Sequence, residues 1–195
     1  KRFWERLSES GFMTRRFVAV FIAARPEKIG LAPPGTARVK TLTLGPLLPA
    51  EVDLYISERG LTLDADAEKR VRSLQGEVTS LVAWCDYYDA VQDYGARRLA
   101  LAEDKLKYLE EELREKTKDG VVRGGTELLI LVLRILGHLA RLQGRLDEAA
   151  WYYGDAVAMA EKEGAGLPNQ IGYLYLDLGH VARHQGRWED AIYYY

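Results

Sequence analysis

Cysteine is nearly absent from this sequence: among 195 residues, only Cys85 is a cysteine. A disulfide framework is therefore excluded, and one isolated thiol fits a reducing compartment. Proline is also scarce, with six residues, and the 18 glycines do not gather into a low-complexity linker. The longest apolar run, residues 17–24, is too short to cross a bilayer. Because no signal peptide is readable either, these absences predict a cytoplasmic protein with no membrane partner.

The sequence has enough apolar residues for a folded core, because 48% are hydrophobic and 29% charged. The net charge of -2 is unevenly divided, with +6 on residues 1–40 and -8 on the rest. A basic start can face nucleic acid. No interleaved aromatic residues or known nucleic-acid motif accompany it, so we do not expect a nucleic-acid partner. A solvated face, or a surface docked on another part of a larger protein, explains the charge as well.

The two ends suggest that the chain is a piece of a longer protein. It starts with Lys1 rather than Met, and it stops at Tyr195 inside an expected helix. We therefore interpret every function below as that of a fragment.

The first 78 residues read as a small α/β segment. Residues 17–24 form a continuous apolar run rich in β-branched and aromatic residues, which is typical of a strand buried on both faces. A second short strand is expected at residues 39–44. Helices are expected at residues 51–59, closed by Gly60, and after Asp64, which can cap its first turn.

The order of strand, Ala24-Arg25-Pro26-Glu27, loop and "TLTLGPLLPAEVDLYISERG" resembles the back end of a STAND-type (NB-ARC/AAA-like) P-loop ATPase module. The resemblance implies that Arg25 senses the terminal phosphate of a nucleotide, with ATP and magnesium bound in the parent protein. Alternatively, Arg25 caps a strand and pairs with a carboxylate. No G-x-x-x-x-G-K-[ST] loop occurs here, so we expect no catalysis and no cofactor in this fragment. The family's Gly-x-Pro is also missing, since the matching stretch reads Gly76-Glu77-Val78.

The carboxyl-terminal half repeats itself. Residues 137–153 and 179–195 are identical at ten of 17 positions, at an offset of 42. Such a period predicts a solenoid of helix hairpins. Small residues are expected where helices approach closely, glycine at left-handed caps, and tyrosine in the next layer. These structural positions are Gly137, Ala140, Gly144, Ala149 and Tyr153, with their counterparts Gly179, Ala182, Gly186, Ala191 and Tyr195.

This pattern resembles the tetratricopeptide repeat in a 42-residue spacing, over residues 126–195. We expect helices at residues 127–142, 147–162 and 169–184, and another that starts near residue 188. Residues 79–118 are expected to form two helices, either a connector or a degenerate repeat. The resemblance implies a protein or peptide partner.

Candidate binding residues recur around the turns between helices. Arginines occur at equivalent places in the two repeats, and they are Arg141, Arg145, Arg183 and Arg187. They could bind an acidic peptide, or they are solvated charges at helix ends. Tyr152 and Tyr173 are candidates to line a groove, because aromatic residues favour interfaces, and helical spacing also fits a place in the core for such tyrosines. Self-association is expected at the carboxyl-terminal end, where Trp188, Ile192 and the last three tyrosines lack a helix to pack on.

Histidines give the only metal-like spacing, since His180 and His184 are one helical turn apart. His138 and His180 occupy equivalent repeat positions, so a structural role needs fewer assumptions, and we predict no metal site.

Taken together, the sequence predicts a mainly α protein, a tetratricopeptide-type hairpin solenoid preceded by a small α/β remnant with one or two strands. The function expected from it is an interaction scaffold or sensor region of a STAND-type signalling ATPase. The alternative is a nucleotide-binding hydrolase fragment whose phosphate loop lies upstream of residue 1.

Overall fold

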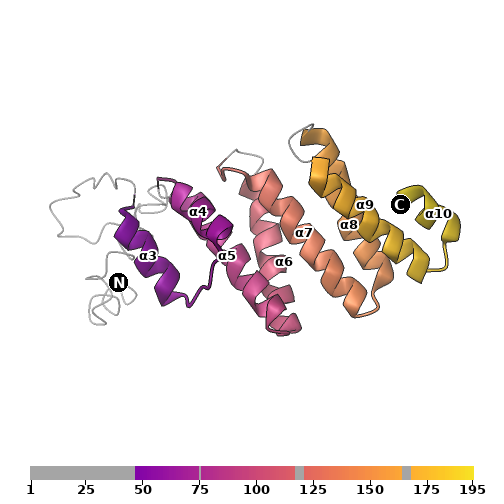
Figure 1. Ribbon diagram of the computed structural model, residues 1–195, viewed down its shortest axis with the longest axis horizontal. Coiled ribbons are helices and arrows are strands. Elements are labelled where there is room, and N and C mark those ends of the chain that lie inside the picture. The colour runs from indigo at the N-terminus through magenta and orange to yellow at the C-terminus, as the bar shows by residue number, and fades with distance from the viewer. Residues whose placement is uncertain (1–46, 75, 117–120, 164–167) are drawn as a thin grey trace, which may run out of the picture. The chain divides into compact units, whose positions relative to one another are not determined.

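The computed structural model describes residues 47–74, 76–116, 121–163 and 168–195. Within these ranges the chain is mainly helical, with eight helices and no strand (Figure 1). The helices are α3 (Pro49–Glu58), α4 (Ala65–Ser73), α5 (Val78–Gly95), α6 (Leu99–Lys116), α7 (Gly125–Leu142), α8 (Leu146–Glu163), α9 (Pro168–His184) and α10 (Trp188–Tyr194). The expected strands at residues 17–24 and 39–44, and the α/β part they define, lie outside the described residues.

The eight helices pair into four hairpins, α3/α4, α5/α6, α7/α8 and α9/α10, which we number 1 to 4. Each first helix ends in a Schellman motif. In hairpin 3, Gly144 donates its N–H to the carbonyl of Arg141 (3.1 Å), and Arg145 donates to that of Ala140 (2.9 Å). The same two bonds occur in the other three hairpins. In each hairpin the residue that donates the first of these bonds is left-handed, with a φ between 61° and 76°. These residues are Gly60, Arg97, Gly144 and Gly186 in hairpins 1 to 4.

These left-handed residues are 37, 47 and 42 positions apart, so the four turns provide a common register for the hairpins. The register puts α5/α6 on the same plan as α7/α8 and α9/α10. Within the expected helical segment 79–118, the described helices α5 and α6 therefore have the turn geometry of hairpins 3 and 4. Hairpin 1 departs from it, because α4 begins five residues after Gly60, whereas α6, α8 and α10 begin two residues after their left-handed residue.

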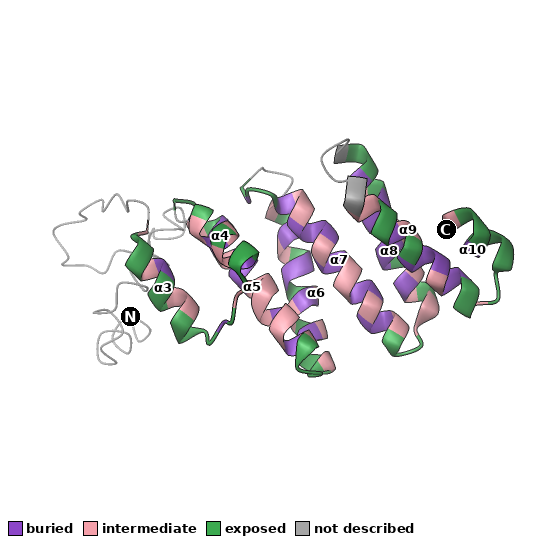
Figure 2. Ribbon diagram, viewed as in Figure 1, coloured by how far each residue is buried: buried purple, intermediate pink, exposed green. Residues whose placement is uncertain are grey.

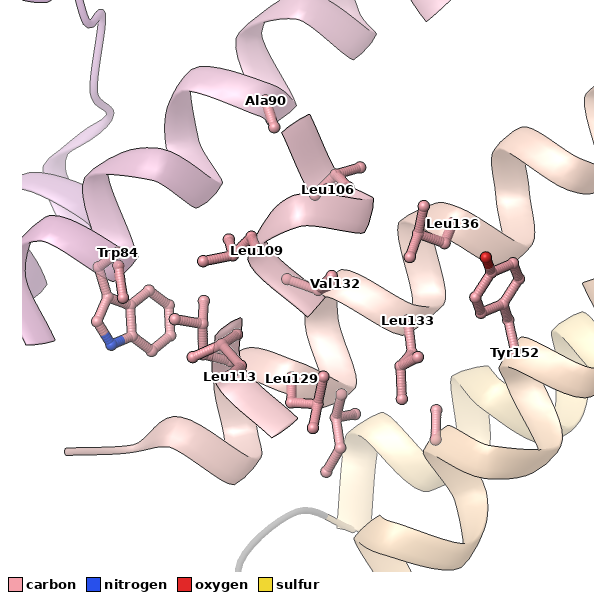
Figure 3. Packing of buried hydrophobic residues seen from close by; sticks show 14 of the residues in the cluster. Trp84, Ala90, Leu106, Leu109, Leu113, Leu129, Val132, Leu133, Leu136 and Tyr152 are labelled. Atoms are coloured by element: carbon pink, nitrogen blue, oxygen red, sulfur yellow. The ribbon is translucent and has the colours of Figure 1, made fainter. Parts of the chain in front are cut away.

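One apolar core runs through the hairpins. From α5 onward, each helix packs on the next helix along the chain. Figure 3 shows side chains of α6 lying between Trp84 of α5 and the leucines of α7. Buried residues accordingly lie on the facing sides of the helices, whereas much of α3 and α10 is exposed (Figure 2).

Glycine and tyrosine interlock within hairpins 3 and 4. A Cβ atom added to Gly137 would lie 2.4 Å from the Tyr153 ring, and one added to Gly179 would lie 2.6 Å from the Tyr195 ring. At either distance the ring would have to shift, and the fully buried Tyr153 ring has no room to do so; its position therefore requires the glycine opposite it. Tyr153 is fully buried, but Tyr195, which was expected to fill the next layer, is 59% exposed.

The other repeated small residues are buried as well, which allows the helices to approach closely. Ala140, Ala149 and Ala182 have no exposed surface, and Ala191 is 3% exposed.

Hairpin 1 is attached to α5, within a compact unit that spans Pro46–Tyr195. The Gln92 amide donates to the Gly60 carbonyl (3.2 Å) and accepts from the Thr62 N–H (2.9 Å). Arg59 forms an ion pair with Asp86 of α5. The sequence groups α3 and α4 with the segment before residue 79; in the structure α4 packs on α5, and apolar residues of both α3 and α4 belong to the same core as those of α5.

Candidate partner-binding face

Corresponding positions on α5, α7 and α9 form rows along one side of these first helices. Residues three, seven and ten positions apart lie on the same side of a helix. We call the resulting surface the first-helix face. Its rows, taken at the offsets of 47 and 42, are Trp84, Leu131 and Tyr173; Tyr87, Arg134 and Leu176; Val91, His138 and His180; and Tyr94, Arg141 and Arg183.

A polar cluster on this face joins α7 to α9. Arg134 of α7 lies over the Tyr173 ring of α9, 5.1 Å from its centroid, and donates through Nε to Asp177 Oδ2 (2.9 Å). His138 Nε2 is 3.1 Å from the same oxygen. Burial alone would raise the pKa of Asp177, but the hydrogen bonds from His138 and Arg134 outweigh it and hold that pKa below its usual value.

The amino-terminal end of the first-helix face is covered, whereas its carboxyl-terminal end is open. Trp84 on α5 is 1% exposed: the Arg70 guanidinium of α4 lies 4.3 Å from its ring centroid on one side, and its Nε1 donates to the Arg123 carbonyl (3.5 Å) in the loop before α7. Arg70 also pairs with Glu127 of α7 (3.0 Å). On α9 the Arg134 guanidinium lies over one side of the Tyr173 ring, but no helix among the described residues covers this part of the face, and Tyr173 stays 54% and Leu176 42% exposed.

Two of the candidate arginines lie on this open part. Arg183 is exposed and Arg141 is half-buried. Among the described residues neither guanidinium forms an ion pair with a carboxylate, and the buried Nε of Arg141 has no hydrogen-bond partner. The exposed Arg183 charge is therefore available to an acidic ligand, and the half-buried Arg141, which interacts with the buried Tyr153 hydroxyl, adds positive charge to the same face.

The other two candidate arginines are engaged within the chain. Arg145 Nε donates to Gln143 (2.9 Å), and the guanidinium pairs with Glu103 of α6 (2.7 Å) and with Glu148. One repeat later, Arg187 Nε donates to Gln185 (3.0 Å) and the side chain pairs with Asp190 (3.2 Å). These arginines support the turns, and Arg145 also joins α8 to α6.

Gln143 and Gln185 extend this repeated role between hairpins. Gln143 donates to Glu103 (2.9 Å) and Gln185 donates to Asp147 (2.7 Å), so each turn is tied to the hairpin before it.

Tyr152 does not belong to a partner-binding surface in this structure. It is 6% exposed and packs in the core beside Leu133 and Leu136 (Figure 3). Burial raises its pKa to about 12. The adjacent Trp151, 56% exposed, has the outward position instead, because neighbouring residues on a helix point in different directions.

The remaining candidates show no reactive site. Cys85 is fully buried, and desolvation raises the pKa of its thiol to about 12, which keeps it protonated. No cluster of three or more potential metal ligands occurs in the described residues, and His180 contacts the Tyr195 hydroxyl instead (3.0 Å).

Arg25, the expected nucleotide sensor, lies outside the described residues. Within the part that the structure covers, no helix is long and apolar enough to span a membrane.

Comparisons with known proteins return no match: no family model, no curated protein and no solved structure matches the chain. The repeated geometry and the residues of the first-helix face are therefore the basis for a function.

Sequence reasoning missed the cluster that joins α7 to α9. In the sequence, Asp177 could have been recognised as a carboxylate that interrupts the apolar residues of α9, next to Leu176. The signal for Arg134 was a charged residue one helical turn before His138. The covering of Trp84 by α4 had no signal in the repeat, because hairpin 1 departs from the repeat register.

Proposed function

We propose that this chain is a protein-interaction module of the tetratricopeptide type, which binds a protein or peptide on the first-helix face of α7 and α9. The observation that carries the proposal is the open part of this face, where Tyr173 and Leu176 are exposed and Arg183 has no paired carboxylate among the described residues. Repeated hairpins present side chains in rows, and such rows form extended binding surfaces. The interlocked glycine and tyrosine pairs support the tetratricopeptide assignment.

The residues of this face have distinct roles in the proposal. Tyr173 and Leu176 provide apolar contact area, while Arg141 and Arg183 attract acidic groups. Asp177 keeps Arg134 and the Tyr173 ring in place. Arg145 and Arg187 are turn residues here, not ligand contacts.

The wider proposal is that the module belongs to a cytoplasmic signalling ATPase of STAND type, in which the repeats sense a partner and Arg25 senses nucleotide. Its support is the sequence around Arg25 and the lone cysteine, together with helices α3 and α4 at their expected places.

Cross-linked capture from a lysate of cells that express the protein tests the proposal. The baits are the full chain, a Tyr173→Ala/Arg183→Glu variant, and a Lys162→Glu control. Lys162 is exposed on α8, away from the first-helix face, and its reversal changes the net charge as much as that of Arg183. We expect proteins that the wild type and the control capture and that the double variant loses at least tenfold. Identical captures by all three baits, or ATP turnover by the purified chain, would contradict the proposal.

A further inference from the structure

Helix α4 is an example, within the chain, of a helix that covers the first-helix face. Its apolar residues Ala67 and Val71 are one turn apart and buried, with Leu74 following them, so the helix is amphipathic. Arg70, beside this buried edge, lies over Trp84 and reaches Glu127 of α7. A short amphipathic helix therefore fits this face where it begins.

The face that α4 covers continues without a cover onto α9. Tyr173 corresponds to Trp84, and Leu176 corresponds to Tyr87. The exposed fraction rises from 1% at Trp84 to 54% at Tyr173. From Tyr173 to Arg183 the face spans ten residues, or about 15 Å of helix. That length matches the nine residues of α4.

The exposed part of the face on α7 and α9 is positively charged, whereas the part that α4 covers offers α4 a negative charge. Arg70 of α4 finds a carboxylate, Glu127. The open part has Arg141 and Arg183 without paired carboxylates among the described residues, and its Asp177 is already bound by Arg134 and His138. A ligand for this part must therefore bring negative charge.

We propose that the first-helix face of α7 and α9 binds an amphipathic helix of a partner protein, with acidic side chains toward Arg141 and Arg183. Its apolar edge lies on Tyr173 and Leu176, which continue the face on which α4 places Arg70 over Trp84. This inference rests on the proposed function and specifies the partner's class: a helix of about three turns, apolar along one edge and acidic at one end.

Fluorescence anisotropy with three labelled synthetic peptides tests the inference. The first is a 17-residue helical peptide of alanine, leucine and glutamate, with leucines at i, i+3, i+4 and i+7 and glutamates after them. The second has two central alanines replaced by proline, which prevents the helix. The third has lysine in place of every glutamate. We expect the first peptide to bind the full chain at least tenfold more tightly than the other two. Its affinity should fall at least tenfold in Tyr173→Ala and in Arg183→Glu, but not in Lys162→Glu.

The alternative outcomes separate this inference from the proposed function. Equal binding of the proline peptide, still sensitive to Tyr173→Ala, would overturn the helical partner and leave a module for extended peptides. Equal binding of the lysine peptide would overturn the acidic partner. No binding, or binding that ignores both face variants, would overturn the inference, while the capture experiment still decides the proposed function. Because Tyr173 and Arg183 are exposed, we expect circular dichroism to show all variants folded.

Discussion

Arg97 is the residue at which the four turns differ. The other three left-handed positions are glycines, whereas Arg97 adopts a φ of 61° with a full side chain. A non-glycine residue in this conformation costs about 1 kcal/mol or more. We therefore expect Arg97→Gly to raise the free energy of unfolding by about 1 kcal/mol, measured by urea denaturation.

Ala96 is the matched control for this change. It precedes Arg97, is exposed and has a φ of -78°. Ala96→Gly relieves no strain and should not stabilise the chain. Equal stability of Arg97→Gly and wild type would show that the left-handed conformation at this turn is not strained.

Gly137 lies directly against the Tyr153 ring. An added Cβ would lie 2.4 Å from the Tyr153 ring, so Gly137→Ala should destabilise the protein by about 2 kcal/mol through overpacking. In hairpin 2 the corresponding residues are Ala90 and Leu106, both fully buried. The pair alanine–leucine thus occupies the place of glycine–tyrosine.

A double-mutant cycle checks this reading of the pair. Tyr153→Leu alone should destabilise by leaving a cavity, and we expect Gly137→Ala/Tyr153→Leu to be more stable than the sum of the single changes predicts, by at least 1 kcal/mol. Thermal and urea denaturation provide the measurement. Strictly additive effects would mean that the glycine does not serve the tyrosine ring.

At the scale of elements, the sequence predicted most helices to within two residues, because hydrophobic periodicity and caps are local signals. The repeat in hairpins 3 and 4 was visible through its glycines and tyrosines. For hairpin 2 the sequence does not decide between a connector and a repeat, since its turn has Arg97 in place of glycine and its spacing is 47 rather than 42. Hairpin 2 thus has the same turn geometry without the glycine and tyrosine residues that mark the repeat in hairpins 3 and 4.

The binding face was less predictable than the helices. Which of two adjacent aromatic residues, Trp151 or Tyr152, points outward depends on how neighbouring hairpins rotate around the core. Similarly, recurrence in sequence marked Arg145 and Arg187 as well as Arg183, but only contacts between helices reveal which charges are already paired. Both are consequences of tertiary packing, which periodicity does not encode.

Glu103 joins α6 to the turn between α7 and α8, through Gln143 and Arg145. Burial would raise the pKa of Glu103, but hydrogen bonds from Lys107, Gln143 and Arg145 outweigh it and lower the pKa from 4.5 to about 2. A lowered pKa in the folded state stabilises the protein fully above pH 4.5, and this stabilisation is lost as the pH falls toward 2. Because Arg145 and Lys107 are partly exposed, we expect a contribution of about 1 kcal/mol.

Glu103→Gln tests this contribution through its pH dependence. Compared with wild type, the variant should lose about 1 kcal/mol of the stability difference between pH 6 and pH 3, measured by urea denaturation. Glu111→Gln, which changes an exposed carboxylate on the same helix, is the control. If both variants retained the wild-type pH dependence, the link between α6 and the turn between α7 and α8 would not be electrostatic.

Across the whole described unit, the hairpins pack mainly on their neighbours along the chain, and the ion pair between Arg70 and Glu127 also joins hairpin 1 to hairpin 3. The stability of such arrays is approximately the sum of the stabilities of the single hairpins and of the interfaces between neighbours. The reach of a destabilising substitution therefore depends on which hairpin contains it. Leu174 of α9 and Leu106 of α6 are both fully buried leucines. Leu174 lies in the last hairpin, whereas Leu106 lies in a hairpin that has neighbours on both sides.

Leu174→Ala should therefore act locally and Leu106→Ala broadly. Each leaves a cavity worth about 3 kcal/mol. In native-state hydrogen exchange, we expect Leu174→Ala to speed exchange in α9 and α10 at least tenfold while α5 and α6 keep their wild-type rates, because hairpin 4 can open without the others. Leu106→Ala should speed exchange in α5, α6 and α7 together. Equal acceleration across all helices in Leu174→Ala would mean that the unit unfolds as one cooperative domain, and that its repeats are similar in shape but not independent in energy.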